Sequence, residues 1–355
     1  MRENYFVFFL DTPNADTEIL GRRARDWVLR EFYDVPHCVL EGGASTDFKT
    51  LSEAADISDS AYYFVLYLDM PLVTKKLLET LTAEASRRLL LRIEFPDGFM
   101  QMTAAGDNQQ KYFLRTEDFS RLDNAKSMAI VYNSLKERIN TRLISQGVYI
   151  PDPQCVYIDD TAEIEEGAAI YPLTYIKGSS RIRSGATIIS SYIDCGEVEE
   201  GARVAYSYIT SSIVRKGSEV GPFARLRGAD IGEHCRIGDF VEVKASKLHK
   251  GVKAAHLTYI GDAEVGDNTN IGCGTVFCNY DGKKKHRTRV GKNSFIGANV
   301  NLVAPVTIGD EVFIAAGTTV TKDINDGEFC IGRVRQETKA RKKDEADSGA
   351  GKPDG

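Results

Sequence analysis

One histidine in the second half of the chain has neighbours that favour acid–base chemistry. His256 lies between small residues in Ala254-Ala255-His256-Leu257. A neutral imidazole near pH 7 can take a proton from an attacking amine. A lone histidine is more often structural, so the side chains that surround it decide between the two interpretations.

Those side chains are suited to an anionic substrate. Arg225, Arg227 and Lys244 precede His256, and Tyr259 and Asn270 follow it. Cations of this kind bind groups such as a sugar phosphate, while the hydroxyl and the amide add neutral hydrogen bonds. A turn, Asn279-Tyr280-Asp281-Gly282, then opens a basic run over 283–287. That run is either a solvated loop or a further phosphate contact.

The elements that must position these residues follow from a repeat of six. Neither a helix nor simple strand alternation places an aliphatic residue at every sixth position, whereas hexapeptide repeats do. The pattern predicts a parallel β-helix, a triangular solenoid of about nine coils with three short strands each. The inward aliphatics form two clean series, Ile158, Ile164, Ile170, Ile176, Ile182 and Ile188, and Val290, Ile296, Leu302, Ile308, Ile314 and Val320.

Between the clean series the six-residue register continues with slips, which indicate short insertions or deletions at corners. The polar stretch 278–289 should loop out of its coil. Flat faces of such a prism favour trimers, with small-molecule sites in the grooves between neighbours. The in-phase residues of this middle part are Val198, Val204, Val214, Val220, Leu226, Ile231, Ile237, Val243, Val265, Ile271 and Phe277.

Composition excludes several classes of function. The chain has 355 residues and a net charge of −6, which argues against a general nucleic-acid binder. No apolar run is long enough to span a bilayer. The seven cysteines are odd in number and include no CxxC pair, so we expect a reduced, cytoplasmic setting.

Four segments are expected along the chain. Residues 1–119 should form an α/β domain, with strands over 5–10, 62–68 and 89–93 and helices over 18–33 and 74–88. A helix within 120–149, with Met128, Val131, Leu135, Ile139 and Leu143 on one face, should link it to the solenoid at 150–335. The charged, glycine-rich segment 336–355 has the composition of a disordered tail.

Six segments of the solenoid together closely resemble a known enzyme family. They are GPFARLRGA (221–229), FVEVKAS (240–246), AAHLTYIGDAEVGDNTNIG (254–272), GTVFCNYDGKKKH (274–286), NLVAPVTIG (301–309) and IAAGTTVTKD (314–323). The resemblance is to the bacterial bifunctional N-acetylglucosamine-1-phosphate uridyltransferase/glucosamine-1-phosphate acetyltransferases. It implies a left-handed parallel β-helix that acts as an acetyl-CoA-dependent, homotrimeric acetyltransferase without a metal ion, for UDP-N-acetylglucosamine synthesis.

The resemblance also implies roles for individual residues. His256 would be the general base on the amino group of glucosamine 1-phosphate. The sugar phosphate would be bound by Arg227, Lys244, Tyr259 and Asn270, with Lys285 from a neighbouring chain, and Glu242 would orient the amine. Acetyl-CoA would be contacted by Cys273, Asn279, Tyr280, Ala298, Ala316 and Arg333.

Three departures from the family's motifs lie near this site. Arg227-Gly228-Ala229 is one residue shorter than the family's Arg-Pro-Gly-Ala, Cys273 replaces an alanine, and Ala298 replaces a serine. We expect direct transfer, with the oxyanion stabilised by backbone N–H groups. Cys273 as a covalent acyl carrier is the alternative, although no activating histidine or cation flanks it in sequence.

The first 119 residues depart much further from the family. The strand at 5–10 runs into Asp11-Thr12-Pro13-Asn14-Ala15-Asp16, which lacks the glycine-rich phosphate loop. Asp69 is either a magnesium ligand or a remnant acid at the end of a strand. We therefore expect a degenerate nucleotidyltransferase-like domain without uridyltransferase activity, and a separate uridyltransferase as a partner.

Three alternatives remain for the function. The acceptor could be another amino sugar, or the chain could be a non-catalytic trimeric scaffold or regulator. A zinc hydratase would need three histidine ligands around one metal, and the histidines here show no spacing that repeats by coil.

Overall fold

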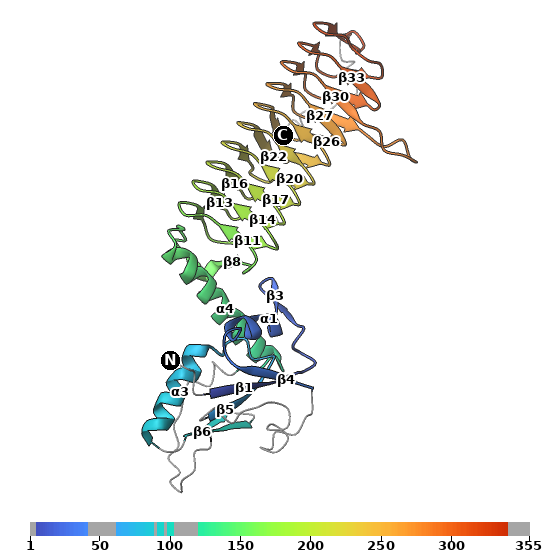
Figure 1. Ribbon diagram of the computed structural model, residues 1–355. Helices are drawn as coiled ribbons and strands as arrows, with labels where there is room; N and C mark the ends of the chain where they lie inside the picture. Colours follow the sequence, from blue (N-terminus) through green and yellow to red (C-terminus); the bar gives the residue numbers. More distant parts are fainter. Residues whose placement is uncertain (1–4, 42–61, 89–90, 96–97, 103–119, 340–355) are drawn as a thin grey trace, which may run out of the picture.

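The computed structural model describes residues 5–41, 62–88, 91–95, 98–102 and 120–339 of the chain. An α/β unit lies at one end, helix α4 leads away from it, and a long three-sided solenoid continues to the C-terminal end (Figure 1). None of the helices in these ranges is both long and apolar enough to cross a bilayer. The tail expected to be disordered lies from residue 340 onward outside the described residues.

The N-terminal unit is built on a small parallel sheet. Its described strands have the order β4 (His37–Leu40), β1 (Tyr5–Leu10), β5 (Tyr62–Tyr67). Two helices belong to the same unit: α1 (Ala24–Glu31), which precedes β4, and α3 (Lys75–Arg88), which follows β5. Strand β6 (Leu91–Phe95) pairs with β7 (Gly98–Met102) in an antiparallel hairpin.

The helix predicted over 18–33 is wrong in its first third. Residues Glu18–Ile19 (β2) and Arg22–Arg23 (β3) form an antiparallel hairpin, and α1 begins only at Ala24. The turn is possible because Leu20 and Gly21 both adopt positive φ angles, 48° and 80°. A helical hydrophobic spacing could not reveal this turn.

Helix α4 (Ala125–Ser145) has clear start and stop signals. Asn124 and Ser127 form a reciprocal capping box at its start, and Gly147 follows its end with a φ of 89°. The apolar residues predicted on one face are buried, namely Val131, Leu135, Ile139 and Leu143. Met128, in the first turn of the helix, is an exception and is 43% exposed.

The rest of the described chain forms three parallel sheets, one on each side of the prism. The histidine face, named for His256, contains β10 (Ala169–Ile170), β13 (Thr187–Ile189), β16 (Arg203–Ala205), β19 (Glu219–Val220), β22 (Arg236–Asp239), β25 (Lys253–His256), β28 (Asn270–Ile271), β31 (Phe295–Ile296), β34 (Phe313–Ile314) and β36 (Phe329–Cys330). The tyrosine face contains β8 (Val156–Ile158), β11 (Thr174–Lys177), β14 (Tyr192–Asp194), β17 (Tyr208–Thr210), β20 (Arg225–Arg227), β23 (Glu242–Lys244), β26 (Tyr259–Gly261), β29 (Val276–Cys278), β32 (Asn301–Val303) and β35 (Thr319–Val320). The glutamate face contains β9 (Glu163–Ile164), β12 (Arg181–Ile182), β15 (Glu197–Val198), β18 (Ile213–Val214), β21 (Asp230–Ile231), β24 (Lys247–Leu248), β27 (Ala263–Val265), β30 (Thr288–Val290) and β33 (Val306–Ile308).

The left-handed parallel β-helix expected from the hexads and from the family resemblance is thus confirmed. Strands on each face pair with the strand one coil away, so the coils stack in parallel register. Both predicted aliphatic series point inward, and only Ile164 among them is partly exposed. Burial of these side chains is the main stabilising contribution, at about 25 cal/mol per Å² of apolar surface.

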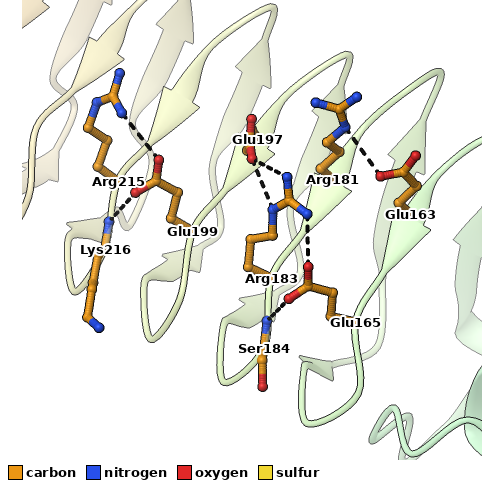
Figure 2. Close-up of polar contacts among 9 residues, drawn as sticks. All are labelled: Glu163, Glu165, Arg181, Arg183, Ser184, Glu197, Glu199, Arg215 and Lys216. Atoms are coloured by element: carbon orange, nitrogen blue, oxygen red, sulfur yellow. Dashed lines mark hydrogen bonds and ion pairs between the residues drawn. The ribbon is translucent and has the colours of Figure 1, made fainter.

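The glutamate face is lined by charged side chains (Figure 2). Arg183 lies between Glu165 and Glu197, with 2.8 Å from a guanidinium nitrogen to a carboxylate oxygen on each side. Glu165 also accepts a hydrogen bond from the Ser184 backbone amide at 2.9 Å. Glu199 likewise accepts one from the Lys216 backbone amide at 3.0 Å. These carboxylates therefore connect successive coils, and the face is suited to water.

The corner between the histidine and tyrosine faces is apolar instead. Five large side chains protrude there, each at least half exposed: Leu173, Tyr206, Phe223, Phe240 and Leu257. We call this row the apolar ridge. It borders a groove of about 510 Å³ whose lining includes Tyr175, Tyr192, Tyr208 and Arg225. The prism thus has one charged, solvent-exposed face and one apolar corner.

The N-terminal unit docks onto the first coil through one buried carboxylate. The Asp160 side chain is fully buried and lies within 2.5 to 2.8 Å of Arg22, Arg30 and Arg142. Its amide donates to the Leu20 carbonyl at 2.9 Å. Leu20 also belongs to the same apolar cluster as the first coils, so the β2–β3 hairpin covers the end of the solenoid.

Candidate functional site

His256 is at the surface of the solenoid, as an acid–base residue must be. It ends strand β25, and its side chain is 58% exposed. Leu257 follows with a φ of 45°, so the chain turns sharply onto the tyrosine face directly after the imidazole. Nδ1 lies 2.8 Å from the Asp239 carboxylate, one coil earlier. A ring held in this way leaves Nε2 directed away from the carboxylate.

The positions level with His256 in the next three coils hold small residues. The register of β25, β28, β31 and β34 places Cys273, Ala298 and Ala316 successively above His256. The Asn299 amide donates to the Cys273 carbonyl, and the Gly317 amide to the Ala298 carbonyl, both at 2.8 Å. Cys273, Ala298 and Ala316 form a row of small side chains along the corner, which we call the small-residue track.

Arg333 lies at the far end of the small-residue track. Its Nη1 donates to the Ala316 carbonyl at 2.6 Å. The structure therefore brings Ala316 and Arg333 together, as expected for residues that contact one extended ligand. Asn270 lies at the start of β28, on the histidine face three residues before Cys273.

A cationic cluster lies on the tyrosine face where strands β20 and β23 end, away from the apolar corner. Arg227 and Lys244 are paired positions of β20 and β23, and the Lys285 side chain reaches Lys244 from the loop after β29. The Lys285 ammonium lowers the pKa of Lys244, and the Arg227 charge adds to this effect. Cations that repel one another at an exposed surface favour a bound anion.

Two neutral side chains border the cationic cluster. The Asn279 amide nitrogen lies 3.4 Å from the Tyr259 hydroxyl and donates to Asp262 at 2.5 Å. Gly261 makes room for them, because a Cβ there would come within 2.4 Å of the Tyr259 hydroxyl. Glu242 accepts hydrogen bonds from the Arg227 guanidinium. Glu242 thus pairs with Arg227 of the cationic cluster, and its strand position is paired with that of Tyr259, three residues after His256.

The loop that carries Lys285 is organised by one aspartate. Asp281 Oδ1 accepts from the amides of Lys283 and Lys284 at 2.7 Å, and its Oδ2 lies 2.7 Å from His286 Nε2. These contacts lower the pKa of Asp281, the Lys284 amide contributing most. The stretch predicted to loop out does so over 279–287, although Tyr280 and Lys285 form an antiparallel bridge within it.

The predicted residues therefore form two groups on one chain. His256, Asn270 and the small-residue track lie at or beside the apolar corner. Arg227 and Lys244 lie on the two preceding coils instead, at strand positions level with Gly261, which is five residues after His256. Five extended residues span up to about 16 Å. The departure at Arg227-Gly228 lies at a corner where Gly228 has a φ of 59°, so the shortened motif still turns.

Three acidic residues of the site were missed from the sequence. Asp239, Asp262 and Asp281 contact His256, Asn279 and His286 respectively. The signal for the first two was spacing, since each lies 17 residues from its partner, which is one coil. A repeat of inward aliphatics does not by itself point to that outward spacing.

Asp69, in the N-terminal unit, is not exposed to solvent as a metal ligand at the surface would be. Its carboxylate is fully buried and receives two hydrogen bonds from Arg121, at 3.1 and 3.2 Å. The same guanidinium lies over the Tyr67 ring at 4.1 Å. This pairing supports the remnant-acid interpretation. Within the described ranges, no group of three or more His, Cys, Asp or Glu side chains could hold a metal ion.

The fold and the surface residues define a hexapeptide-repeat protein with a left-handed β-helix. The family model described as "Bacterial transferase hexapeptide (six repeats)" matches residues 287–322. Those residues span parts of the last described coils, where the aliphatic series is cleanest.

Curated relatives confirm the resemblance that the motifs predicted. The "Bifunctional protein GlmU" of Nitratidesulfovibrio vulgaris (strain DP4) is 49% identical over 211 residues, which cover 59% of this chain and 46% of the relative. That of Clostridium novyi (strain NT) is 44% identical over 222 residues, covering 62% and 49%. The chain spans about half the length of the curated relatives it matches.

Solved structures show a more distant likeness. The "UDP-N-acetylglucosamine acyltransferase from Campylobacter jejuni" is 17% identical, with a TM-score of 0.31, over 50% of this chain and 71% of that chain. No function follows from similarity at this level.

Proposed function

We propose that the chain is an N-acetyltransferase that moves the acetyl group of acetyl-CoA to the amino group of glucosamine 1-phosphate. The observation that carries the proposal is the exposed His256 at the start of the small-residue track. The similarity to the bifunctional GlmU proteins supports it, because His256 and the cationic cluster lie in the segments whose sequence resembles that family.

The small-residue track suits the donor. Acetyl-CoA ends in a long, thin pantetheine arm, which can lie along Cys273, Ala298 and Ala316 with its thioester beside His256. Arg333, which donates to the Ala316 carbonyl, would contact the more distant parts of the coenzyme, and Tyr280 would contact it from the loop that carries Lys285. The backbone N–H groups of the corner would stabilise the oxyanion that forms when the carbonyl is attacked.

The cationic cluster suits the acceptor. The phosphate of glucosamine 1-phosphate would bind Arg227, Lys244 and Lys285, with Tyr259 and Asn270 as hydrogen-bonding partners. His256 would then remove a proton from the amine as its nitrogen attacks the thioester carbon. The new C–N bond forms, the C–S bond breaks, and coenzyme A leaves with the proton as a thiol.

Replacing Lys244 by methionine tests the acceptor. We expect the KM for glucosamine 1-phosphate to rise about 10- to 100-fold, because one charged hydrogen bond of roughly 1.5–3 kcal/mol is lost. The KM for acetyl-CoA should stay within about twofold. Steady-state assays of thiol release measure both. Lys247→Met, on the glutamate face, is the matched control. A panel of amino sugars with and without phosphate identifies the acceptor, and faster turnover of a different amino sugar would favour the alternative acceptor.

A second copy of the chain would complete the site. His256 borders the apolar ridge, and the cationic cluster lies across the tyrosine face. If the ridge of one protomer packs onto the tyrosine face of its neighbour, the neighbour's cations come to face His256. The glutamate face would stay in water, as its exposed ion pairs favour. A homotrimer satisfies this arrangement three times.

Mixing two impaired variants tests the shared site. Random assembly of His256→Ala and Lys244→Met protomers should restore about a quarter of the wild-type sites, since about three quarters of the trimers are mixed and each of these has one of its three interfaces with both residues intact. Thiol release at low sugar phosphate measures the recovery after co-expression. Activity that stays at the mean of the two separate variants would mean that both residues act within one protomer.

The N-terminal unit is proposed to lack uridyltransferase activity, because Asp69 is held by Arg121 and the loop after β1 has no glycine. A separate uridyltransferase would then use the product. A non-catalytic scaffold is the remaining alternative, and failure to bind acetyl-CoA in calorimetry would favour it.

A further inference from the structure

The nearest partner of His256 is a carboxylate one coil earlier. Asp239 ends β22 as His256 ends β25, and the two residues are paired in the parallel register. Their side chains meet at 2.8 Å between Oδ1 and Nδ1, with exposed fractions of 39% and 58%. A substrate can therefore reach the imidazole while the carboxylate is in place.

The backbone on both sides of the pair is fixed. Gly238 allows an unusually close approach, because a Cβ there would come within 2.0 Å of the Ala255 carbonyl oxygen. On the other side, the Leu257 amide donates to the Asp239 carbonyl at 2.9 Å. The two side chains thus start from backbone positions that cannot easily shift.

The chemistry of the carboxylate decides which ring nitrogen carries the proton. The pKa of Asp239 is lowered by its own backbone amide and by the hydrogen bond from His256, so the group is ionised near neutral pH. An ionised carboxylate only accepts hydrogen bonds. Nδ1 must then be the donor, and in the neutral ring the lone pair is on Nε2.

We propose that Asp239 is a positioning residue, which holds His256 in the tautomer and orientation that the acetyl transfer requires. The inference rests on the proposed function, in which Nε2 accepts the amine proton. When Nε2 takes that proton, the ring becomes a cation and Asp239 stabilises it through the Nδ1–H bond. The proton then passes from Nε2 to the coenzyme A sulfur, and the pair returns to its initial state.

Two substitutions separate the parts of this role. Asp239→Ala removes the acceptor, and Asp239→Asn keeps an acceptor oxygen without the charge. The control is Glu264→Gln, which neutralises the carboxylate of a similar pair, since Glu264 lies 3.0 Å from His249 Nε2 on the glutamate face. We expect Asp239→Ala to lower kcat about 10- to 100-fold, less than the roughly 10⁴-fold seen for a fully buried triad aspartate.

The KM values for both substrates should stay within about twofold in Asp239→Ala, because the residue contacts neither substrate directly. Asp239→Asn should fall between the wild type and Asp239→Ala in kcat, since it orients the ring but cannot stabilise the cation. Glu264→Gln should keep the wild-type kcat. If Asp239 had only a structural role, its replacement would lower thermal stability without producing this order of kcat values.

The tautomer is measured independently of activity. In protein labelled with ¹⁵N-histidine, the spectrum of the full-length chain at high pH distinguishes a protonated from a bare ring nitrogen, and His256→Gln identifies the signal. We expect the wild type to have a bare Nε2, and Asp239→Ala to shift toward a protonated Nε2.

A wild-type ring protonated at Nε2, or a kcat for Asp239→Ala equal to that of Glu264→Gln in an active enzyme, would overturn the proposal. If the wild type transfers no acetyl group to any amino sugar phosphate, the proposed function fails by itself. The spectra then still decide whether Asp239 fixes the ring.

Discussion

Replacing His256 by alanine should lower the kcat of acetyl transfer by about 10²- to 10⁴-fold, the usual contribution of a general base. The loss arises because no other group would take the amine proton as the C–N bond forms. The KM for glucosamine 1-phosphate should change little, since the cationic cluster that binds its phosphate is intact. Thiol release under saturating acetyl-CoA measures the effect.

The control for this variant is His249→Ala. His249 also pairs with a carboxylate, Glu264, but it lies on the glutamate face, so its loss should leave kcat within about twofold of the wild type. Equal rates for His256→Ala and the wild type would remove His256 from the mechanism.

A cysteine variant distinguishes direct transfer from a covalent intermediate. Cys273 lies level with His256 in the next coil, so the structure brings to the thiol a histidine that does not flank it in sequence. Direct transfer predicts that Cys273→Ala, which restores the residue of the resembled family, retains most of the rate. A loss as large as that of His256→Ala would indicate an acyl-cysteine.

Replacing Asp160 by alanine should lower the free energy of unfolding by about 3 kcal/mol. This value is at the low end of the roughly 3–5 kcal/mol found when one partner of a buried ion pair is removed, because the three arginines are partly exposed. Their charges would repel one another beneath the β2–β3 hairpin. We expect the N-terminal unit to come loose from the first coil, with faster proteolysis between α4 and β8.

The matched control for Asp160→Ala is Glu163→Gln. Glu163 and Arg181 form an exposed pair at 3.3 Å (Figure 2), so its loss should cost no more than about 0.5 kcal/mol. Chemical denaturation of both variants measures the difference. Equal destabilisation would mean that the docking does not depend on the buried carboxylate.

The Asp160 contribution also has a definite pH dependence. Burial opposes its ionisation, but hydrogen bonds and charges from Arg22, Arg142 and Arg30 outweigh burial, so the pKa of Asp160 lies below its ordinary value. Its stabilisation is therefore fully present above the unfolded pKa of about 3.9 and is lost as the pH falls through the lower folded value. The difference between wild type and Asp160→Ala should persist at pH 6 and shrink below pH 4.

The sequence alone determined the solenoid and its core. An inward aliphatic at every sixth position has one stable arrangement, because a single coil cannot bury its own apolar side chains. Ile182, Ile188, Ile296 and Ile314 are accordingly all fully buried. The motifs around His256 also indicated a resemblance to the bifunctional uridyltransferase/acetyltransferases, which the curated relatives confirm.

Only the tertiary structure decided which outward side chains meet. Coils differ in length, with 16 residues between the paired positions Arg203 and Glu219 but 25 between Asn270 and Phe295. Such changes leave the core pattern intact, because inward residues only need to be apolar. They shift every surface pairing, so the Asp239–His256 contact could not be deduced from the hexads. The Asp160 and Asp69 ion pairs depend on packing between distant segments, which no local pattern in the sequence encodes.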